Sequence, residues 1–105
     1  MVSVSEVFKA WNEGFTNKDS GKLAEFFTDD FRFVSRVRDM GKQETLEWTS
    51  TGEMAIDNLE VIYGNDEVAV VHHDANRGDN AGVAMVVYLK RGDKISSCRV
   101  VRTAT

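Results

Sequence analysis

The chain has 105 residues, with 13 basic against 17 acidic side chains, so its net charge at neutral pH is −4. Hydrophobic residues make up 42% and charged residues 29%, which excludes a disordered chain and suits one domain over residues 1–105. An acidic chain without a basic run repels phosphate backbones and anionic headgroups, so we expect neither nucleic acid nor membranes as partners.

The N-terminal segment has the periodicity of an amphipathic helix. Apolar residues recur at positions 4, 7, 8, 11 and 15, which places them on one helix face. Ser3 and Glu6 have the spacing of a capping box, so the helix is expected to begin there. The polar run 17–21 ends it, and a second, shorter helix is expected to end before Asp29. The apolar side chains of that second helix are Leu23, Phe26 and Phe27.

A strand and a third helix are expected next. Residues 31–37 alternate, with Phe33 and Ser35 on one face of a short strand. Residues 41–51 contain a helical stretch of poor periodicity that includes Trp48. The rest of the chain is predicted to form an antiparallel meander with strands at 58–63, 67–75, 83–90 and 94–102.

The meander carries a pattern that bears on assembly. Residues 68–71 and 83–89 are apolar at successive positions, so both faces of the sheet need a cover. The helices cover one face, and the simplest cover for the other is a second copy of the chain. The alternative is a helix that wraps further around the sheet.

The single cysteine, Cys98, cannot form an internal disulfide. The first residues lack the basic and apolar segments of a secretory signal, and the longest apolar run, 83–89, is too short to cross a bilayer. We therefore expect a reducing, cytoplasmic location. Without a cationic neighbour or a helix N-terminus to lower its pKa, Cys98 is expected to be a buried core thiol.

Four segments are similar to the opening of SnoaL-like cyclases and ketosteroid-isomerase-like proteins. They are Trp11–Asp19, Leu23–Phe27 (LAEFF), Asp29–Phe33 (DDFRF) and Gly41–Glu44 (GKQE). With the order of helices and strands, they make nearly the whole chain resemble the NTF2-like superfamily. The resemblance implies an α+β, cystatin-like cone, in which three N-terminal helices pack on a curved, mainly antiparallel sheet around an apolar pocket.

The resemblance does not decide the activity, because members of this superfamily serve as isomerases, cyclases, dehydratases, hydrolases or binding modules. In the ketosteroid-isomerase-like branch a carboxylate moves the proton, and a tyrosine and a protonated carboxyl group stabilise the oxyanion. The matching positions here hold Ser35, Trp11 and Met85. The tryptophan retains one N–H donor, but Ser35 cannot take a carbon-bound proton and Met85 is an apolar filler. Steroid-isomerase chemistry is therefore not expected.

The only histidines, His72 and His73, are neighbours on a predicted strand and so point to opposite faces. They cannot bind one metal ion together. His72 shares a face with Asp74, but no third ligand is placed, so we expect no metal site. One histidine must face the pocket, where it would act as general acid or base. The alternative is a histidine bonded to backbone or lying in a dimer interface.

A two-residue turn at positions 91–92 would pair Met85 with Cys98 and Val83 with Val100, on the pocket face. By alternation Arg99 then lies on the opposite face. The side chains expected to line the ligand pocket are Trp11, Phe15, Phe33, Ser35, Trp48, Met54, Met85, Cys98 and Val100.

Two classes of function follow from these residues. The first is a pocket that binds a small apolar organic ligand, with cofactor-independent chemistry of the isomerase, lyase or cyclase type by a pocket histidine. The second is a non-catalytic module for ligand binding, dimerisation or protein interaction. An open cavity favours the first class, and a cone packed shut favours the second.

Overall fold

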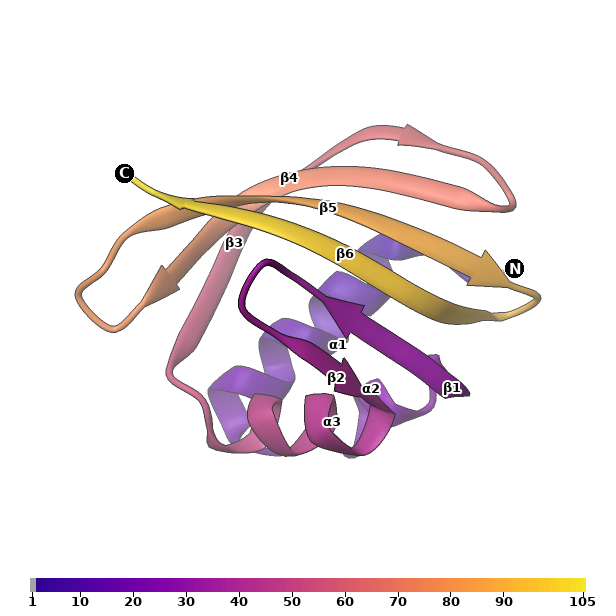
Figure 1. The fold of residues 1–105 in the computed structure, drawn as a ribbon, viewed down its shortest axis with the longest axis horizontal. Coiled ribbons are helices and arrows are strands. Elements are labelled where there is room, and N and C mark those ends of the chain that lie inside the picture. The colour runs from indigo at the N-terminus through magenta and orange to yellow at the C-terminus, as the bar shows by residue number, and fades with distance from the viewer. Residues whose placement is uncertain (1) are drawn as a thin grey trace.

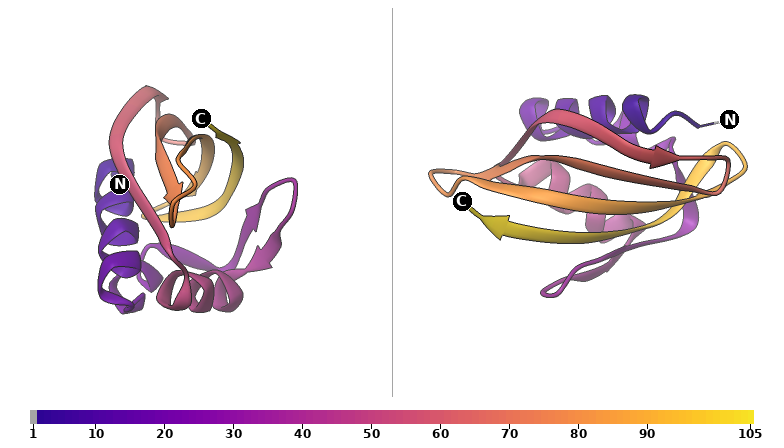
Figure 2. Two further views of the ribbon diagram at one scale, coloured as in Figure 1. Left: turned by 90° about the vertical axis from the view of Figure 1, so that its left-hand side faces the viewer. Right: turned by 90° about the horizontal axis from the view of Figure 1, so that it is seen from above.

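The computed structural model describes residues 2–105, and its core is a single curved sheet with the helices on the concave side (Figures 1 and 2). The strand order is β2-β1-β6-β5-β4-β3, and every neighbouring pair is antiparallel except β1 and β6. The helices are α1 (Val4–Asn17), α2 (Gly21–Ala24) and α3 (Lys42–Thr51). The strands are β1 (Phe27–Val34), β2 (Asp39–Gly41), β3 (Met54–Gly64), β4 (Val68–Arg77), β5 (Gly82–Arg91) and β6 (Lys94–Ala104).

The first helix is confirmed. It begins directly after Ser3 and buries the apolar face that the periodicity predicts. The capping box does not form, because the Ser3 side chain makes no cap hydrogen bond. The buried apolar residues of this helix are Val4, Val7, Ala10, Trp11 and Phe15.

The second predicted helix is largely wrong, because α2 is a single turn that ends before Phe26 and Phe27. Phe27 instead begins β1, stacks on Phe31 with ring centroids 3.8 Å apart, and pairs with Ile95 of β6. The amide of Ile95 also donates to the carbonyl of Phe26 at 2.7 Å. Long-range pairing with β6 therefore overrides the local helical pattern. It starts the strand four residues before the predicted position.

The third helix exists, and its poor apolar periodicity has a structural reason. Its inward face is formed by Thr45 and Thr49, both fully buried. The Thr49 hydroxyl accepts a hydrogen bond from the Trp11 indole N–H at 3.0 Å and donates to the Thr45 carbonyl at 2.9 Å. A buried polar contact thus joins α3 to α1. Apolar side chains usually form such a helix–helix contact, and their absence here is why the apolar periodicity of α3 is weak.

The hairpin of β5 and β6 has a register that differs from the predicted one. The turn occupies residues 92–93, and a bulge at Ser96 shifts the pairing by one more residue. Tyr88 therefore pairs with Cys98, and Met85 pairs with Val101. The predicted pairing of Met85 with Cys98 is wrong. Because the bulge inserts one residue, Met85 lies on the convex face of the sheet.

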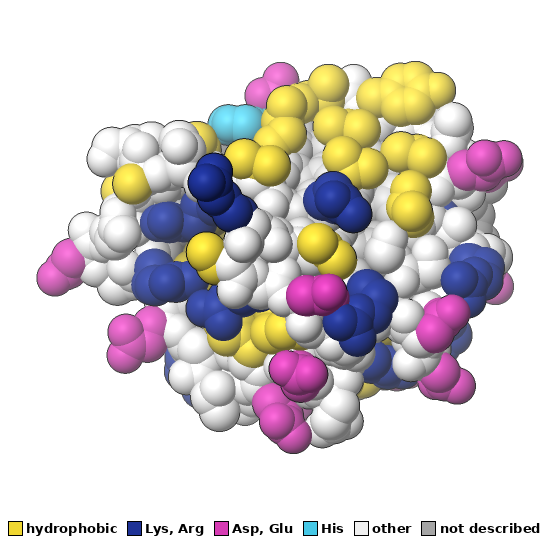
Figure 3. All heavy atoms as spheres, in the orientation of Figure 1, with side chains coloured by type: hydrophobic (Ala, Val, Ile, Leu, Met, Phe, Trp, Pro, Cys, Tyr) yellow, Lys and Arg dark blue, Asp and Glu magenta, His cyan; other side chains and the backbone are white. Residues whose placement is uncertain are grey.

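The convex face of the sheet is apolar and exposed (Figure 3). No helix covers it, in line with the prediction that this face needs another cover (Figure 2). Arg99 is exposed on this face, as alternation predicts. Within residues 2–105, no helix is both long and apolar enough to span a membrane. The large hydrophobic side chains exposed on strands β3, β5 and β6 are Val61, Ile62, Tyr63, Met85, Val87, Leu89 and Val101.

Candidate functional site

A cavity of about 120 Å³ lies between the concave face of the sheet and the helices. Eight of the nine predicted pocket side chains line it, and so does His73. Met85 does not line it, because the β5–β6 register turns its side chain outward, where it is 43% exposed. The lining residues are Trp11, Phe15, Phe33, Ser35, Val37, Arg38, Trp48, Met54, Ile56, His73, Ala75, Arg77, Ala84, Val86, Tyr88, Cys98, Val100 and Arg102.

The sheet contributes its side of the cavity through cross-strand rows of inward-facing residues. One row contains His73, Ala84 and Arg102. The next inward row pairs Val86 with Val100, so Val100 does not face Val83 as predicted. A third row contains Ala69, Tyr88 and Cys98. The small side chains of Ala84 and Ala75 leave room above the sheet, which is why the cone is open at this level.

Four aromatic side chains, carried by α1, β1 and α3, form a second wall of the cavity. The ring centroids of Phe33 lie 5.9 Å from Trp11 and 5.3 Å from Trp48, and those of Phe15 and Trp48 lie 5.3 Å apart. Such edge and tilted contacts hold the rings rigidly. The indole N–H of Trp11 is already bonded to Thr49, so it is not the free pocket donor that the sequence suggested.

His73 is the histidine on the cavity side, and His72 pairs with Met85 on the convex side. The Nδ1 of His73 lies 2.8 Å from the backbone carbonyl of Asp74. Because a carbonyl can only accept, Nδ1 carries the proton and Nε2 is the free basic nitrogen of the neutral ring. The ring is 6% exposed and contacts the edge of Phe8, with ring centroids 5.0 Å apart.

Burial lowers the pKa of His73 below its ordinary value of 6.5, because desolvation penalises the imidazolium form. The hydrogen bond to the Asp74 carbonyl acts in the opposite direction, but it is the smaller effect. His73 is therefore a neutral base at pH 7. Such a ring can take a proton from a bound molecule and return it.

Tyr88 supplies a hydrogen-bond donor that the sequence analysis missed. Its side chain is 3% exposed, and burial raises its pKa well above the ordinary 10, so the phenol stays protonated. Every fully enclosed side-chain nitrogen or oxygen in residues 2–105 has a hydrogen-bond partner. Tyr88 lines the cavity, and its hydroxyl has no hydrogen-bond partner among those residues, so the hydroxyl is not fully enclosed by protein.

Cys98 and Ser35 have structural surroundings. Burial raises the pKa of the Cys98 thiol above its usual range, so it is not a nucleophilic thiolate at neutral pH. The Ser35 hydroxyl accepts hydrogen bonds from the amides of Val37 and Arg38 at 3.3 and 3.1 Å, and so holds the turn between β1 and β2. Both residues line the cavity wall.

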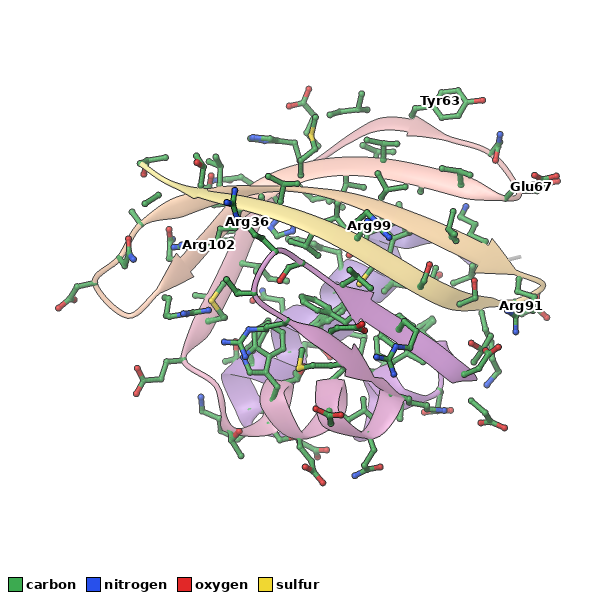
Figure 4. The ribbon with its side chains drawn as sticks, in the orientation of Figure 1. Arg36, Tyr63, Glu67, Arg91, Arg99 and Arg102 are labelled. Atoms are coloured by element: carbon green, nitrogen blue, oxygen red, sulfur yellow. The ribbon has the colours of Figure 1, made fainter. Side chains whose placement is uncertain are left out.

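Three arginines also line the cavity: Arg38, Arg77 and Arg102. None of the three was predicted to line the pocket. Arg38 lies in a turn and Arg77 ends a strand, where alternation says little about direction. Arg102 shares the β6 face of Val100, and this spacing is the signal that could have found it. Figure 4 shows Arg102 where β6 passes the β1–β2 turn. Within residues 2–105, no group of three histidine, cysteine or acidic side chains is arranged to hold a metal ion.

No protein-family model matches the sequence, and no curated protein matches it. Solved structures do match over nearly the whole chain. An NTF2-like protein of unknown function from Cytophaga hutchinsonii superposes with a TM-score of 0.82 at 10% identity, covering 98% of this chain and 92% of that one.

Two further similar structures carry names of enzymes. A candidate ketosteroid isomerase from Kribbella flavida has a TM-score of 0.71 at 13% identity, covering 96% of this chain and 80% of that one. A candidate scytalone dehydratase from Novosphingobium aromaticivorans has a TM-score of 0.64 at 13% identity, covering 95% and 81%. At these identities the likeness establishes the fold alone.

The state of His73 can be tested by NMR titration of the His72→Gln variant, whose only imidazole is His73. We expect a titration midpoint below 6.5 and the tautomer protonated at Nδ1. Because the folded-state pKa is depressed, the stability linked to His73 is present above 6.5 and is lost as the pH falls through the folded-state pKa. A midpoint above 6.5, or an Nε2-protonated ring, would contradict this assignment.

Proposed function

We propose that this chain, which has the NTF2-like fold, binds a small organic molecule with one ring in its cavity. The observation that carries the proposal is an open, mostly apolar cavity with a few polar groups facing into it. This is the usual composition of a small-molecule site. Its volume of about 120 Å³ is close to the ~150 Å³ of an apolar cavity that holds benzene.

The cavity bears on the alternatives that the sequence left open. A cone packed shut by its aromatic residues would favour a purely structural module, but Trp11 and Trp48 pack against Phe33 and Phe15 and leave the space beside Ala84 open. The volume suits one ring rather than the four fused rings of a steroid. Together with Ser35 at the matched position of the proton-moving carboxylate, this argues against a steroid substrate.

Proton transfer within the bound ligand is the catalytic form of the proposal. The free Nε2 of His73 would accept a proton from carbon or oxygen of the ligand and return it elsewhere on the same molecule. The Tyr88 hydroxyl would donate a hydrogen bond to a ligand oxygen that gains negative charge. Isomerases and dehydratases both rely on such steps, and two of the similar structures bear those names.

A second copy of the chain is proposed to cover the convex face of the sheet. Exposed apolar side chains of β3, β5 and β6 lie there, with the half-buried Val68 and Val70 of β4 between β3 and β5. Arg99 is among them, and Tyr63 lies at the far end of β3 (Figures 3 and 4). An exposed apolar patch on one face of a sheet is typical of a protein–protein interface. A twofold dimer would place the same strands of two chains against each other.

Ligand binding is tested by filling the cavity with the substitution Ala84→Leu. The larger side chain would occupy the space beside His73, so we expect binding of 3-phenylpropan-1-ol, followed by NMR shift changes, to weaken by about tenfold or more. Ala55→Leu is the matched control, because Ala55 is an exposed residue of β3. Unchanged binding in Ala84→Leu, or failure of the wild-type protein to bind the alcohol, would contradict the proposal.

Dimerisation is tested by placing a charge on the convex face with Val101→Glu. Val101 is 69% exposed, so the monomer tolerates the change, whereas a dimer would have to bury two like charges. Light scattering after size exclusion should report a dimer for the wild-type protein and a monomer for this variant. Val37→Glu, at a valine 82% exposed away from that face, should remain dimeric. A monomeric wild type at high micromolar concentration would refute the proposal.

A further inference from the structure

We propose that the ligand of this cavity is a carboxylic acid, whose carboxylate is bound by Arg38, Arg77 and Arg102 while its ring contacts the aromatic wall. The inference rests on the proposed ligand binding and adds the chemical class of the ligand. Three arginines on the lining of one otherwise apolar cavity are the observation that carries it. Arginine is suited to carboxylates, because its planar N–H groups match the two carboxylate oxygens.

Arg102 is held in place before any ligand arrives. Its Nε donates to the carbonyl of Ala75 at 2.9 Å, and its Nη2 donates to the carbonyl of Asn80 at 2.8 Å. The guanidinium also packs closely over Gly82, where a Cβ atom would lie 2.7 Å from Nη2. Two of its five N–H groups are used in this way, which leaves donors free. A fixed guanidinium loses little side-chain freedom when it binds an anion.

The other two arginines come from different elements and meet the same cavity. The guanidinium of Arg38 lies over the Trp48 ring, with its Cζ 5.1 Å from the ring centroid, so it joins the aromatic wall to the charged group. Arg77 ends β4 and pairs with Met54 of β3, another lining residue. A ring held against Trp48 and Met54 would therefore have positive charge beside it from two sides.

The chain has more acidic than basic side chains, so a cluster of arginines without acidic partners is unexpected. The ion pairs between side chains of residues 2–105 join Arg32 to Asp39, Lys42 to Asp29 and Arg91 to Asp30. None of the three cavity arginines forms such a pair, although acidic residues outnumber basic ones in the chain. Unpaired cations gathered at one apolar cavity create a positive potential that attracts an anionic ligand.

The arrangement also places the anion close to the proposed base. His73 and Arg102 flank Ala84 in one cross-strand row, so their backbones lie about 10 Å apart, two strand spacings. Both side chains point into the cavity. A carboxylate on Arg102 would thus hold the neighbouring carbons of the ligand within the space that His73 faces.

The test compares two molecules with the same carbon skeleton, 3-phenylpropanoate and 3-phenylpropan-1-ol, binding to the wild-type protein at low salt. We expect the acid to bind about tenfold more tightly, because charge-assisted hydrogen bonds to arginine are stronger than neutral ones. In the double variant Arg38→Gln/Arg77→Gln this advantage should shrink several-fold, because Arg102 alone then binds the carboxylate, while the alcohol binds as before. Arg102 is left intact because its bonds to backbone carbonyls support the fold.

The control is Lys9→Gln/Lys22→Gln, which removes two positive charges from exposed helix residues that lie neither on the cavity nor on the convex face. It should keep the full preference for the acid. If the alcohol binds and the acid has no advantage, or the advantage is undiminished in Arg38→Gln/Arg77→Gln, this inference is wrong and the binding proposal stands. If neither molecule binds the wild-type protein, both fail.

Discussion

The site depends on one backbone feature, the register between β5 and β6. Side chains alternate along a strand, so one additional residue exchanges the two faces of everything beyond it. The turn at 92–93 and the bulge at Ser96 set this register, and they bring Tyr88 opposite Cys98. The same alignment places Tyr88 on the cavity face that Arg102 shares with Cys98, and turns Met85 away from it. Shifted by one residue, Tyr88 and Arg102 would lie on opposite faces of the sheet.

Much of the fold follows from local patterns in the sequence, and the exceptions have physical causes. Apolar periodicity is sufficient for α1, because its inward face is wholly apolar. It is weak for α3, whose inward face consists of Thr45 and Thr49 bonded to neighbouring elements. The start of β1 at Phe27 depends on pairing with a strand 68 positions later in the chain, Ile95 being its partner, which no local window can show. The three-residue strand β2 is too short to give a pattern.

The candidate site, like the fold, could be predicted only in part from the sequence. Aromatic residues on α1, β1 and α3 converge as their faces require, and one histidine had to face inward. Which histidine does so could not be decided, because β5 is apolar at successive positions and fits either register. Tyr88 was missed for this reason. The sequence does not show where a bulge will form. The cross-strand pairing in the structure is therefore needed to show that His73 shares a row with Arg102.

Cross-strand nuclear Overhauser effects between backbone protons of β5 and β6 test this account most directly. The structure predicts contacts that link Tyr88 with Cys98 and Val86 with Val100. Contacts that instead link Met85 with Cys98 and Val83 with Val100 would contradict it. In that case Tyr88 and Arg102 would lie on opposite faces of the sheet, and the proposed hydrogen-bond donor and the proposed carboxylate site could not both face one cavity.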